Sequence, residues 1–218
     1  MTPTIDRNPR PYVLLPSGNV IDLAAPSPTS WTDEDLAIGL SRTYRWGGHS
    51  RWSRPLMVAQ HSLTVLAIRL RDEPHLSPAH CLYELLHDAE EGLLGFDCIA
   101  PLKAYLGAPF AALCARLTGA VAERYGLPTL TQPEYRHHKR ADRRAAASEA
   151  RYVTSWSERQ IVDTLQLAEE PLNRDPLMNF VTAGDYIEWE PWQADFAAGA
   201  WLDALTSKTA ARAARAVR

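Results

Sequence analysis

The chain has 218 residues, 46% of them apolar, which suits one compact domain with a core large enough to fold without staples. A net charge of −3 and a pI near 6.2 exclude a general nucleic-acid-binding protein, because affinity for the phosphate backbone comes mainly from clustered Lys and Arg. The three cysteines lack CxxC spacing, the N-terminus has no apolar signal-peptide core, and no run approaches the roughly 20 apolar residues of a membrane span. We therefore expect a soluble, cytoplasmic protein whose partners include neither a nucleic-acid polymer nor a membrane.

The first predicted element is a short β-hairpin over Tyr12 to Leu23, where β-favouring residues flank the turn sequence Pro16-Ser17-Gly18-Asn19. A proline-rich connector, residues 24–30, follows. Thr32 is a candidate N-cap for a helix that runs to about Tyr44, because three acidic residues in its first turn favour the positive end of the helix dipole.

The rest of the chain is predicted to be helical. Apolar periodicity and capping signals predict helices over Met57 to Leu70, Ser77 to about Leu94 with Gly95 as the stop, Pro109 to Tyr125, Gln132 to about Trp156, and Trp192 to Leu205. We therefore expect an all-α fold with one domain over residues 1–207. The tail from Lys208 to Arg218 is rich in Ala and Arg without a sustained apolar stripe, and we expect it to fray or be disordered.

The segment LYELLHDAEEGLLG places His87 and Asp88 side by side in an apolar helical stretch. Such a stretch normally avoids a charged carboxylate unless something compensates it, and a divalent ion would do so. Imidazole and carboxylate ligands suit Mn, Co, Fe, Ni, Zn or Mg, and the sequence does not choose among them. Adjacent residues lie about 100° apart around a helix, so one ion would also need ligands from other helices.

Two further residues are candidate ligands. His61 lies on the preceding predicted helix, surrounded by apolar residues, and Asp142 lies in HHKRADRRAAASEA, where alanines permit close helix packing. The resulting order of H, then HD, then D, each on its own predicted helix, resembles the HD-domain phosphohydrolase superfamily.

The resemblance extends beyond these four residues, over about residues 10 to 205. RWGGHSRWSRPLMVAQHSLTV, LYELLHDAEEGLLGFDCIAPLK and HKRADRRAAASEA are similar to blocks of bacterial 5′-deoxynucleotidases and of phage and bacterial deoxynucleoside triphosphate hydrolases. The N-terminal order of hairpin, PxP connector, acidic helix start and RWGGH is more similar to the phage dATP-triphosphohydrolase-like branch. The resemblance implies an HD-domain helical bundle that holds one divalent ion through His61, His87, Asp88 and Asp142.

The same resemblance assigns a proton-handling role to Glu91, which matches the acidic residue one turn beyond the HD pair. In a continuous helix Glu91 is also at i+4 from His87 and therefore on the same face, where it could orient a water or receive its proton. Glu90, beside it, is the alternative, or a solvated charge. Asp97 matches a second polar site residue only across a one-residue insertion, since this chain has Gly95-Phe96-Asp97 where family members commonly have Gly-Asp.

Substrate contacts are implied at the RW pair. Arg45 and Trp46 match residues that contact phosphate and sugar, and Trp46 would leave little space for a 2′-hydroxyl, which implies a deoxynucleotide substrate. Lys103 matches a basic position near the phosphates, and Lys139 is a second match. Read from the residues alone, Arg45 could instead pair with Asp33 or Asp35, and Trp46 could pack on a helix.

Several functional alternatives stay open at this point. The substrate could be a dNMP, cleaved by a 5′-nucleotidase, or a dNTP, cleaved by a triphosphohydrolase. The chain could also be an HD phosphodiesterase with another phosphoester substrate, although the clustered extra histidines of dinuclear members are not evident. A different class would be a non-catalytic nucleotide-binding regulatory protein. The resemblance also implies a homo-oligomer, since the family is often dimeric or larger.

Overall fold

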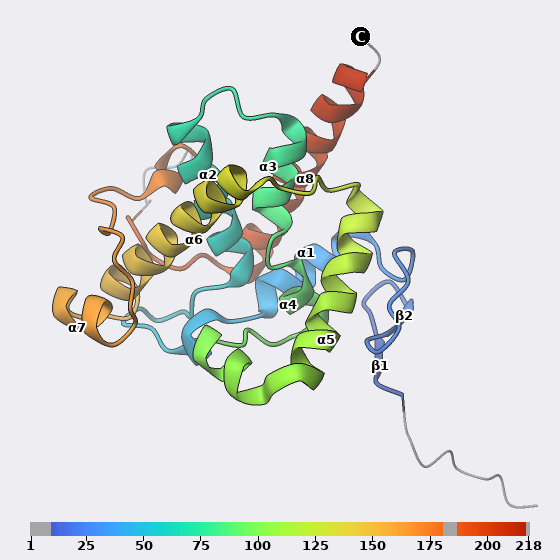
Figure 1. The fold of residues 1–218 in the computed structure, drawn as a ribbon, viewed down its shortest axis with the longest axis horizontal. Helices are drawn as coiled ribbons and strands as arrows, with labels where there is room; N and C mark the ends of the chain where they lie inside the picture. Colours follow the sequence, from blue (N-terminus) through green and yellow to red (C-terminus); the bar gives the residue numbers. More distant parts are fainter. Residues whose placement is uncertain (1–9, 181–186, 217–218) are drawn as a thin grey trace, which may run out of the picture.

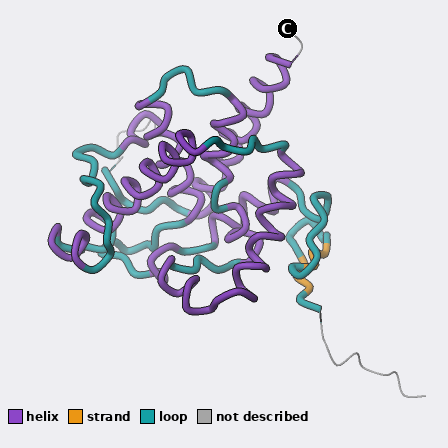
Figure 2. The backbone as a smooth tube through the Cα atoms, in the orientation of Figure 1, coloured by secondary structure: helices purple, strands orange, loops and turns teal. Residues whose placement is uncertain are grey.

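The computed structural model describes residues 10–180 and 187–216, and helices make up most of them (Figures 1 and 2). The all-α fold expected from the sequence is confirmed. The helices are α1 (Asp33–Arg42), α2 (Val58–Asp72), α3 (Pro78–Leu86), α4 (Ala89–Leu94), α5 (Ala100–Tyr125), α6 (Gln132–Tyr152), α7 (Glu158–Asp163) and α8 (Ala194–Ala216), with 3-10 turns η1 (Arg45–Gly48) and η2 (Pro176–Phe180).

The N-terminal hairpin is also confirmed. Strands β1 (Tyr12–Leu14) and β2 (Val20–Asp22) pair antiparallel, with Val13 opposite Ile21, and lie at the edge of the helical body (Figure 1). Ile21 is fully buried and anchors the hairpin to the core. A second anchor is Asp35, whose carboxylate accepts hydrogen bonds from the backbone N–H groups of Ser17 and Thr32, 2.8 and 2.9 Å away. The acid that completes the capping box of α1 therefore also fixes the hairpin turn.

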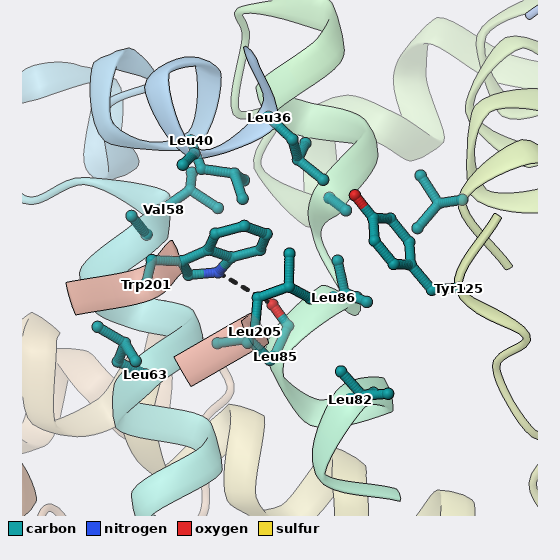
Figure 3. Packing of buried hydrophobic residues seen from close by; sticks show 14 of the residues in the cluster. Leu36, Leu40, Val58, Leu63, Leu82, Leu85, Leu86, Tyr125, Trp201 and Leu205 are labelled. Carbon is teal, nitrogen blue, oxygen red and sulfur yellow. Dashed lines mark hydrogen bonds between the residues drawn. The ribbon is translucent and has the colours of Figure 1, made fainter. Parts of the chain in front are cut away.

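The main hydrophobic core lies where α1, α2, α3 and α8 meet, and Trp201 of α8 is at its centre (Figure 3). Its side chain is fully buried, and its indole N–H donates to the carbonyl of Leu85 at 3.3 Å, which satisfies the one polar atom of the ring. Leucines from α1, α2 and α3 surround it, among them Leu40, Leu63 and Leu86. This core fixes α2, which carries His61, and α3, which ends directly before His87.

The predicted helix from Ser77 to Leu94 is in fact two helices, which corrects the sequence interpretation. Helix α3 ends at Leu86, and α4 begins at Ala89. Asp88 between them has φ −112° and ψ 23°, outside helical geometry, and forms the N-cap position of α4. The predicted stop is confirmed, because Gly95 ends α4 in the left-handed conformation (φ 68°) that glycine adopts at low cost.

Other boundaries differ from the prediction as well. Helix α5 begins at Ala100 and is interrupted at Gly107 (φ 72°, ψ −159°), so the predicted start at Pro109 marks its second segment. The tail predicted to fray is helical to Ala216, and residues 217–218 lie outside the described residues. Arg212 donates to the carbonyls of Tyr125 and Gly126 at the end of α5, which ties the extended helix to the body, and Ala and Arg both have high helix propensity.

One helical stretch of the described residues, Leu102–Tyr125, is long and apolar enough to cross a bilayer, which corrects the expectation that no run approaches this length. The criterion rests on length and composition alone, and only 17% of the stretch is buried. The break at Gly107 interrupts it, and Leu117 and Val121 pack into the core. The stretch is therefore weak evidence for a membrane span.

Helix α4 packs closely against α1 at two glycines, Gly39 of α1 and Gly92 of α4. A Cβ on Gly39 would lie 2.3 Å from the carbonyl oxygen of Gly92, and a Cβ on Gly92 would lie 2.7 Å from the Leu40 side chain. The hydroxyl of Thr43 also donates to the carbonyl of Glu91 at 3.3 Å. This close contact positions the two glutamates of α4.

We therefore expect Gly39→Ala to lower the free energy of unfolding by about 1–3 kcal/mol, the usual cost of overpacking, although alanine is the better helix former. The matched control is Gly199→Ala in α8, where an added Cβ meets nothing within 4 Å and the gain in helix propensity should dominate. Urea denaturation of both variants provides the test. Equal midpoints for the two would show that α1 and α4 are not in tight contact.

Candidate metal centre

The four predicted metal ligands come together from three parts of the chain. His61 is in α2, His87 ends α3, Asp88 precedes α4, and Asp142 is in α6; α2 packs against both α3 and α6 (Figure 1). The Nε2 atom of His61 lies 3.3 Å from Asp142 Oδ1 and 3.7 Å from Asp88 Oδ2. The Nε2 atom of His87 lies 3.2 Å from Asp88 Oδ2 and 3.9 Å from Asp142 Oδ1.

The break between α3 and α4 explains how His87 and Asp88 can serve one centre. In a continuous helix their side chains would diverge by about 100°. Because Asp88 leaves helical geometry, its carboxylate instead turns back to the imidazole of His87. Ligand atoms of His61, His87 and Asp88 all lie within 4.8 Å of one another.

Two buried nitrogen atoms support a metal ion as the missing partner. The Nε2 atoms of His61 and His87 are both buried, and neither forms a well-directed hydrogen bond in the described structure, although carboxylate oxygens of Asp88 and Asp142 lie 3.2–3.9 Å away. A buried polar atom without a partner is costly, so such atoms normally mark a bound water, an ion or a functional group. Two imidazoles facing two carboxylates form a donor set that suits a divalent transition metal. The residues present therefore fit the ion that the sequence predicts.

The other ring nitrogen of each imidazole, Nδ1, has a hydrogen-bond partner on the side away from the cluster. The Nδ1–H of His87 donates to the backbone carbonyl of Glu84 at 2.8 Å, and Nδ1 of His61 lies 2.5 Å from Glu149 Oε1. Ligating histidines commonly have such an outer partner, which orients the ring and leaves the inner nitrogen free for the metal. Both imidazoles are thus oriented with Nε2 toward the carboxylates of Asp88 and Asp142.

The charges of the cluster shift its protonation in the ion-free protein. Burial lowers the pKa of His61, but Glu149 and Asp142 more than offset it and raise the pKa from 6.5 to about 9. Burial also lowers the pKa of His87, and Asp88 and Asp142 raise it to about 8. Burial would raise the pKa values of Asp88 and Asp142, yet the two histidines hold both well below the usual range. At pH 7, therefore, both imidazoles carry a proton and both aspartates are ionised.

We expect metal binding to release protons, because a metal ligand must be a neutral imidazole. With pKa values of about 9 and 8, both histidines are largely cationic at pH 7, and His61 is half deprotonated only at about pH 9, so affinity should rise with pH across this window and beyond it. Calorimetry in buffers of different ionisation enthalpy should give about two protons released per ion at pH 7 and fewer at pH 9.5. Binding without proton release at pH 7 would mean that these histidines do not bind the ion.

The RW pair lies beside the cluster, and Glu149 of α6 holds it there. Glu149 Oε2 accepts hydrogen bonds from Arg45 Nε at 2.9 Å and from Trp46 Nε1 at 3.2 Å. Arg45 Nη1 also lies 3.7 Å from Asp88 Oδ2. The alternative that Arg45 pairs with Asp33 or Asp35 is therefore wrong: Asp33 binds Arg124 and Tyr125, and Asp35 caps α1.

Trp46 also packs against a small hydrophobic cluster, in agreement with the alternative interpretation. Its indole is half-buried against the small cluster that contains Ala147, Ala150 and Ile161, and its backbone has φ 58°, in the left-handed region. A bulky residue in that region indicates a constrained position. The structure thus places Trp46 beside the cluster but also gives it a packing role.

Glu149 was not predicted from the sequence, although it is among the most buried carboxylates of the described chain. Burial raises its pKa, but Arg45 and His61 lower it to about 2, so the carboxylate is ionised. The available signal was its place in AAASEA, two helical turns beyond Asp142 among buried alanines, where an acid needs a partner.

No family model matches the chain. Over 150 residues the chain is 39% identical to Uncharacterized protein RCAP_rcc00048 of Rhodobacter capsulatus, and the alignment covers 68% of this chain and 76% of that protein. The chain belongs to the same family as that protein. Because the name states no activity or ligand, the chemistry of the RCAP_rcc00048 family has to be argued from the site itself.

In this member of the RCAP_rcc00048 family, two buried glutamates of α4 border the cluster. Glu91 Oε1 accepts from Lys103 Nζ at 2.9 Å, whereas its Oε2 and the Oε2 of Glu90 are buried without a hydrogen-bond partner in the described structure. Burial and the nearby Asp88 raise the pKa of Glu91 to about 9 and that of Glu90 to about 7. The helical-phase argument for Glu91 is wrong, since His87 lies outside α4, beyond the break at Asp88. An oxygen of each glutamate and one of Asp88 nevertheless lie within 4.8 Å of one another.

Two further predicted residues lie close by. Lys103, in the first segment of α5, reaches the site through its bond to Glu91. Asp97 is half-buried and close enough to help raise the pKa values of Glu91 and Arg45. Lys139 pairs with Asp142. The cluster therefore combines a metal-ligand set, a candidate proton donor and acceptor, and three cationic side chains.

Proposed function

We propose that this protein is a metal-dependent phosphohydrolase of the HD-domain superfamily that acts on deoxynucleotides. The observation that carries the proposal is the pair of buried, unpartnered imidazole nitrogens of His61 and His87, which face Asp88 and Asp142. Cationic and acidic side chains next to this set supply what hydrolysis of a phosphoester needs in addition to an ion.

His61, His87, Asp88 and Asp142 would hold the ion, as the sequence resemblance implies. When bound, a divalent ion polarises a phosphoryl group and lowers the pKa of a water molecule. The chain's own cations, Arg45 and Lys103, would bind the phosphate and offset the charge that develops on it. Both are close to the cluster, since Arg45 pairs with Asp88 and Lys103 pairs with Glu91.

Glu91 would handle the proton at Oε2. Its Oε1 is engaged by Lys103, which leaves Oε2 as the atom that can take a proton from the attacking water or give one to the leaving oxygen. The pKa of about 9 means that a proton is readily held there in the ion-free protein. The pKa of Glu91 during catalysis would then depend on the bound ion and substrate.

The test of the proposed function is a hydrolysis screen with metal-free protein supplemented with Mn²⁺, Co²⁺, Ni²⁺, Zn²⁺ or Mg²⁺. Substrates are dNMPs, dNTPs and the matching ribonucleotides, with separate detection of phosphate and tripolyphosphate. We expect metal-dependent hydrolysis that favours the deoxy forms; phosphate from dNMP identifies a 5′-nucleotidase and tripolyphosphate from dNTP a triphosphohydrolase. Turnover that is independent of metal, or none with any nucleotide, contradicts the proposal.

Trp46 provides the expectation about the sugar. Trp46→Ala should raise kcat/KM for ribonucleotides relative to deoxynucleotides by about 10- to 100-fold, because it opens the space that a 2′-hydroxyl would need. Trp46→Phe is the matched control: it keeps an aromatic ring, loses the N–H bond to Glu149, and should keep the deoxy preference. Arg45→Ala should weaken the binding of ribonucleotides and of deoxynucleotides to the same extent. If Trp46→Ala leaves the ratio unchanged, Trp46 is a packing residue.

We also propose that the protein acts in the cytoplasm. Its three cysteines are free thiols in the structure, with Cys81 and Cys98 buried, as expected for a chain that folds in a reducing compartment.

A further inference from the structure

We propose that Glu149 is a positioning residue that fixes the tautomer of His61 and couples this metal ligand to Arg45 and Trp46. The inference rests on the metal centre of the proposed function. It goes beyond that centre because it assigns a distinct task to a carboxylate that binds neither ion nor substrate.

The direction of the hydrogen bonds at Glu149 follows from its partners. Arg45 Nε–H and Trp46 Nε1–H can only donate, so Glu149 Oε2 accepts from both. With the guanidinium beside it and the side chain 2% exposed, the carboxylate is ionised and Oε1 is an acceptor as well. The 2.5 Å contact to His61 is therefore donated by Nδ1–H.

The hydrogen bond from Nδ1–H to Glu149 determines the state of the other ring nitrogen of His61. A neutral imidazole that carries its hydrogen on Nδ1 has a lone pair on Nε2. Nε2 of His61 is the buried, unpartnered atom that faces Asp88 and Asp142. Glu149 thus selects the tautomer in which His61 can bind an ion, and it does so from the side opposite the cluster.

A glutamine cannot replace this carboxylate. A side-chain amide has one accepting oxygen and one NH₂ group that only donates. If the oxygen faces the two donors of the RW pair, the NH₂ faces His61, so that Nδ1 must accept and the hydrogen moves to Nε2. If the amide is reversed, the NH₂ opposes Arg45 and Trp46. Because His61 Nδ1 can become an acceptor but the N–H groups of Arg45 and Trp46 cannot, the first orientation should prevail, and it disables the ligand.

His87 provides an internal reference. Its Nδ1 donates to a backbone carbonyl, that of Glu84, so its tautomer does not depend on Glu149. Any effect of Glu149→Gln on the imidazoles should therefore fall on His61 alone. A general loss of structure would affect both histidines.

The experiment uses Co²⁺ as the probe, titrated into the full-length, metal-free protein without nucleotide. We compare the wild type, Glu149→Gln and the control Asp35→Asn, which alters another buried carboxylate, one that accepts from Ser17 and Thr32 among the described residues. Proton NMR of the Co²⁺-loaded proteins then reports paramagnetically shifted, exchangeable Nδ1–H signals. We expect two such signals in the wild type, one from each histidine.

For Glu149→Gln we expect a Co²⁺ affinity about 10- to 100-fold lower, with the His61 signal lost or displaced and the His87 signal kept. Asp35→Asn should bind Co²⁺ like the wild type even if it is less stable. Wild-type affinity with both signals in Glu149→Gln overturns the inference. A single exchangeable signal in the wild type also overturns it, even if Glu149→Gln does not fold. Failure of the wild type to bind Co²⁺ contradicts the metal centre itself.

Discussion

Replacing Asp88 or His87 by alanine is expected to abolish both metal binding and hydrolysis. Each variant removes one of the four ligands and leaves the remaining buried charges poorly compensated, so the affinity lost exceeds that of one metal–ligand bond. Loss of Asp88 should have a larger electrostatic effect than loss of His87, because the Asp88 carboxylate lies close to both imidazoles and to Arg45. Elemental analysis and the nucleotide screen measure the two losses independently.

The matched control for His87→Ala is His80→Ala, two turns earlier on the same helix. His80 is partly exposed and bridges Ser77 and Glu134, away from the cluster, so its loss should leave metal content and turnover unchanged. Asp88→Ala protein that keeps stoichiometric metal and near-normal turnover would show that the proposed centre is wrong. Loss of activity in His80→Ala as well would point to a general loss of structure instead.

Glu91→Gln is expected to keep the metal and to lower turnover by roughly 10²- to 10⁴-fold, the usual range for a lost general acid or base. Glutamine retains the size of the side chain but cannot exchange a proton at Oε2, and it weakens the bond to Lys103. Single-turnover kinetics on the preferred nucleotide measure the effect on the chemical step.

Glu90→Gln provides the comparison, since Glu90 is equally a buried acid of α4 and has a raised pKa. If Glu91 is the proton-handling residue, only the Glu91 variant should lose the ionisation that governs the pH profile of kcat. Unchanged kcat in Glu91→Gln would move this role to Glu90 or Asp97.

The sequence predicted the elements whose signals are local. The hairpin followed from its turn residues, α1 from the Thr32 cap and the acids after it, and the end of α4 from Gly95. The four candidate ligands could be selected because residues of that chemistry occur in an order that resembles a known family. Each of these features is determined by residues within a short stretch of the chain.

Features set by contacts between distant segments were not predictable in the same way. The apolar pattern runs unbroken through His87 and Asp88, so nothing local marks the end of α3; α4 is fixed instead by its contact with α1 through Gly39 and Gly92. The helical tail depends on Arg212 reaching the end of α5.

Glu149 illustrates the same limit within the site. Its three donors come from α2 and the η1 turn, far from it in the sequence. Before the fold is known, an acid among alanines indicates that a partner exists but not which one. The structure supplies the partners, and they turn a buried charge into a proposed determinant of metal binding.

Anomalous X-ray diffraction from crystals of the protein grown with Co²⁺ tests the central claim most directly. We expect one strong peak bonded to Nε2 of His61, Nε2 of His87 and the carboxylates of Asp88 and Asp142. No peak at this cluster under conditions that saturate the protein with Co²⁺, or a peak bound by other residues, would contradict the account.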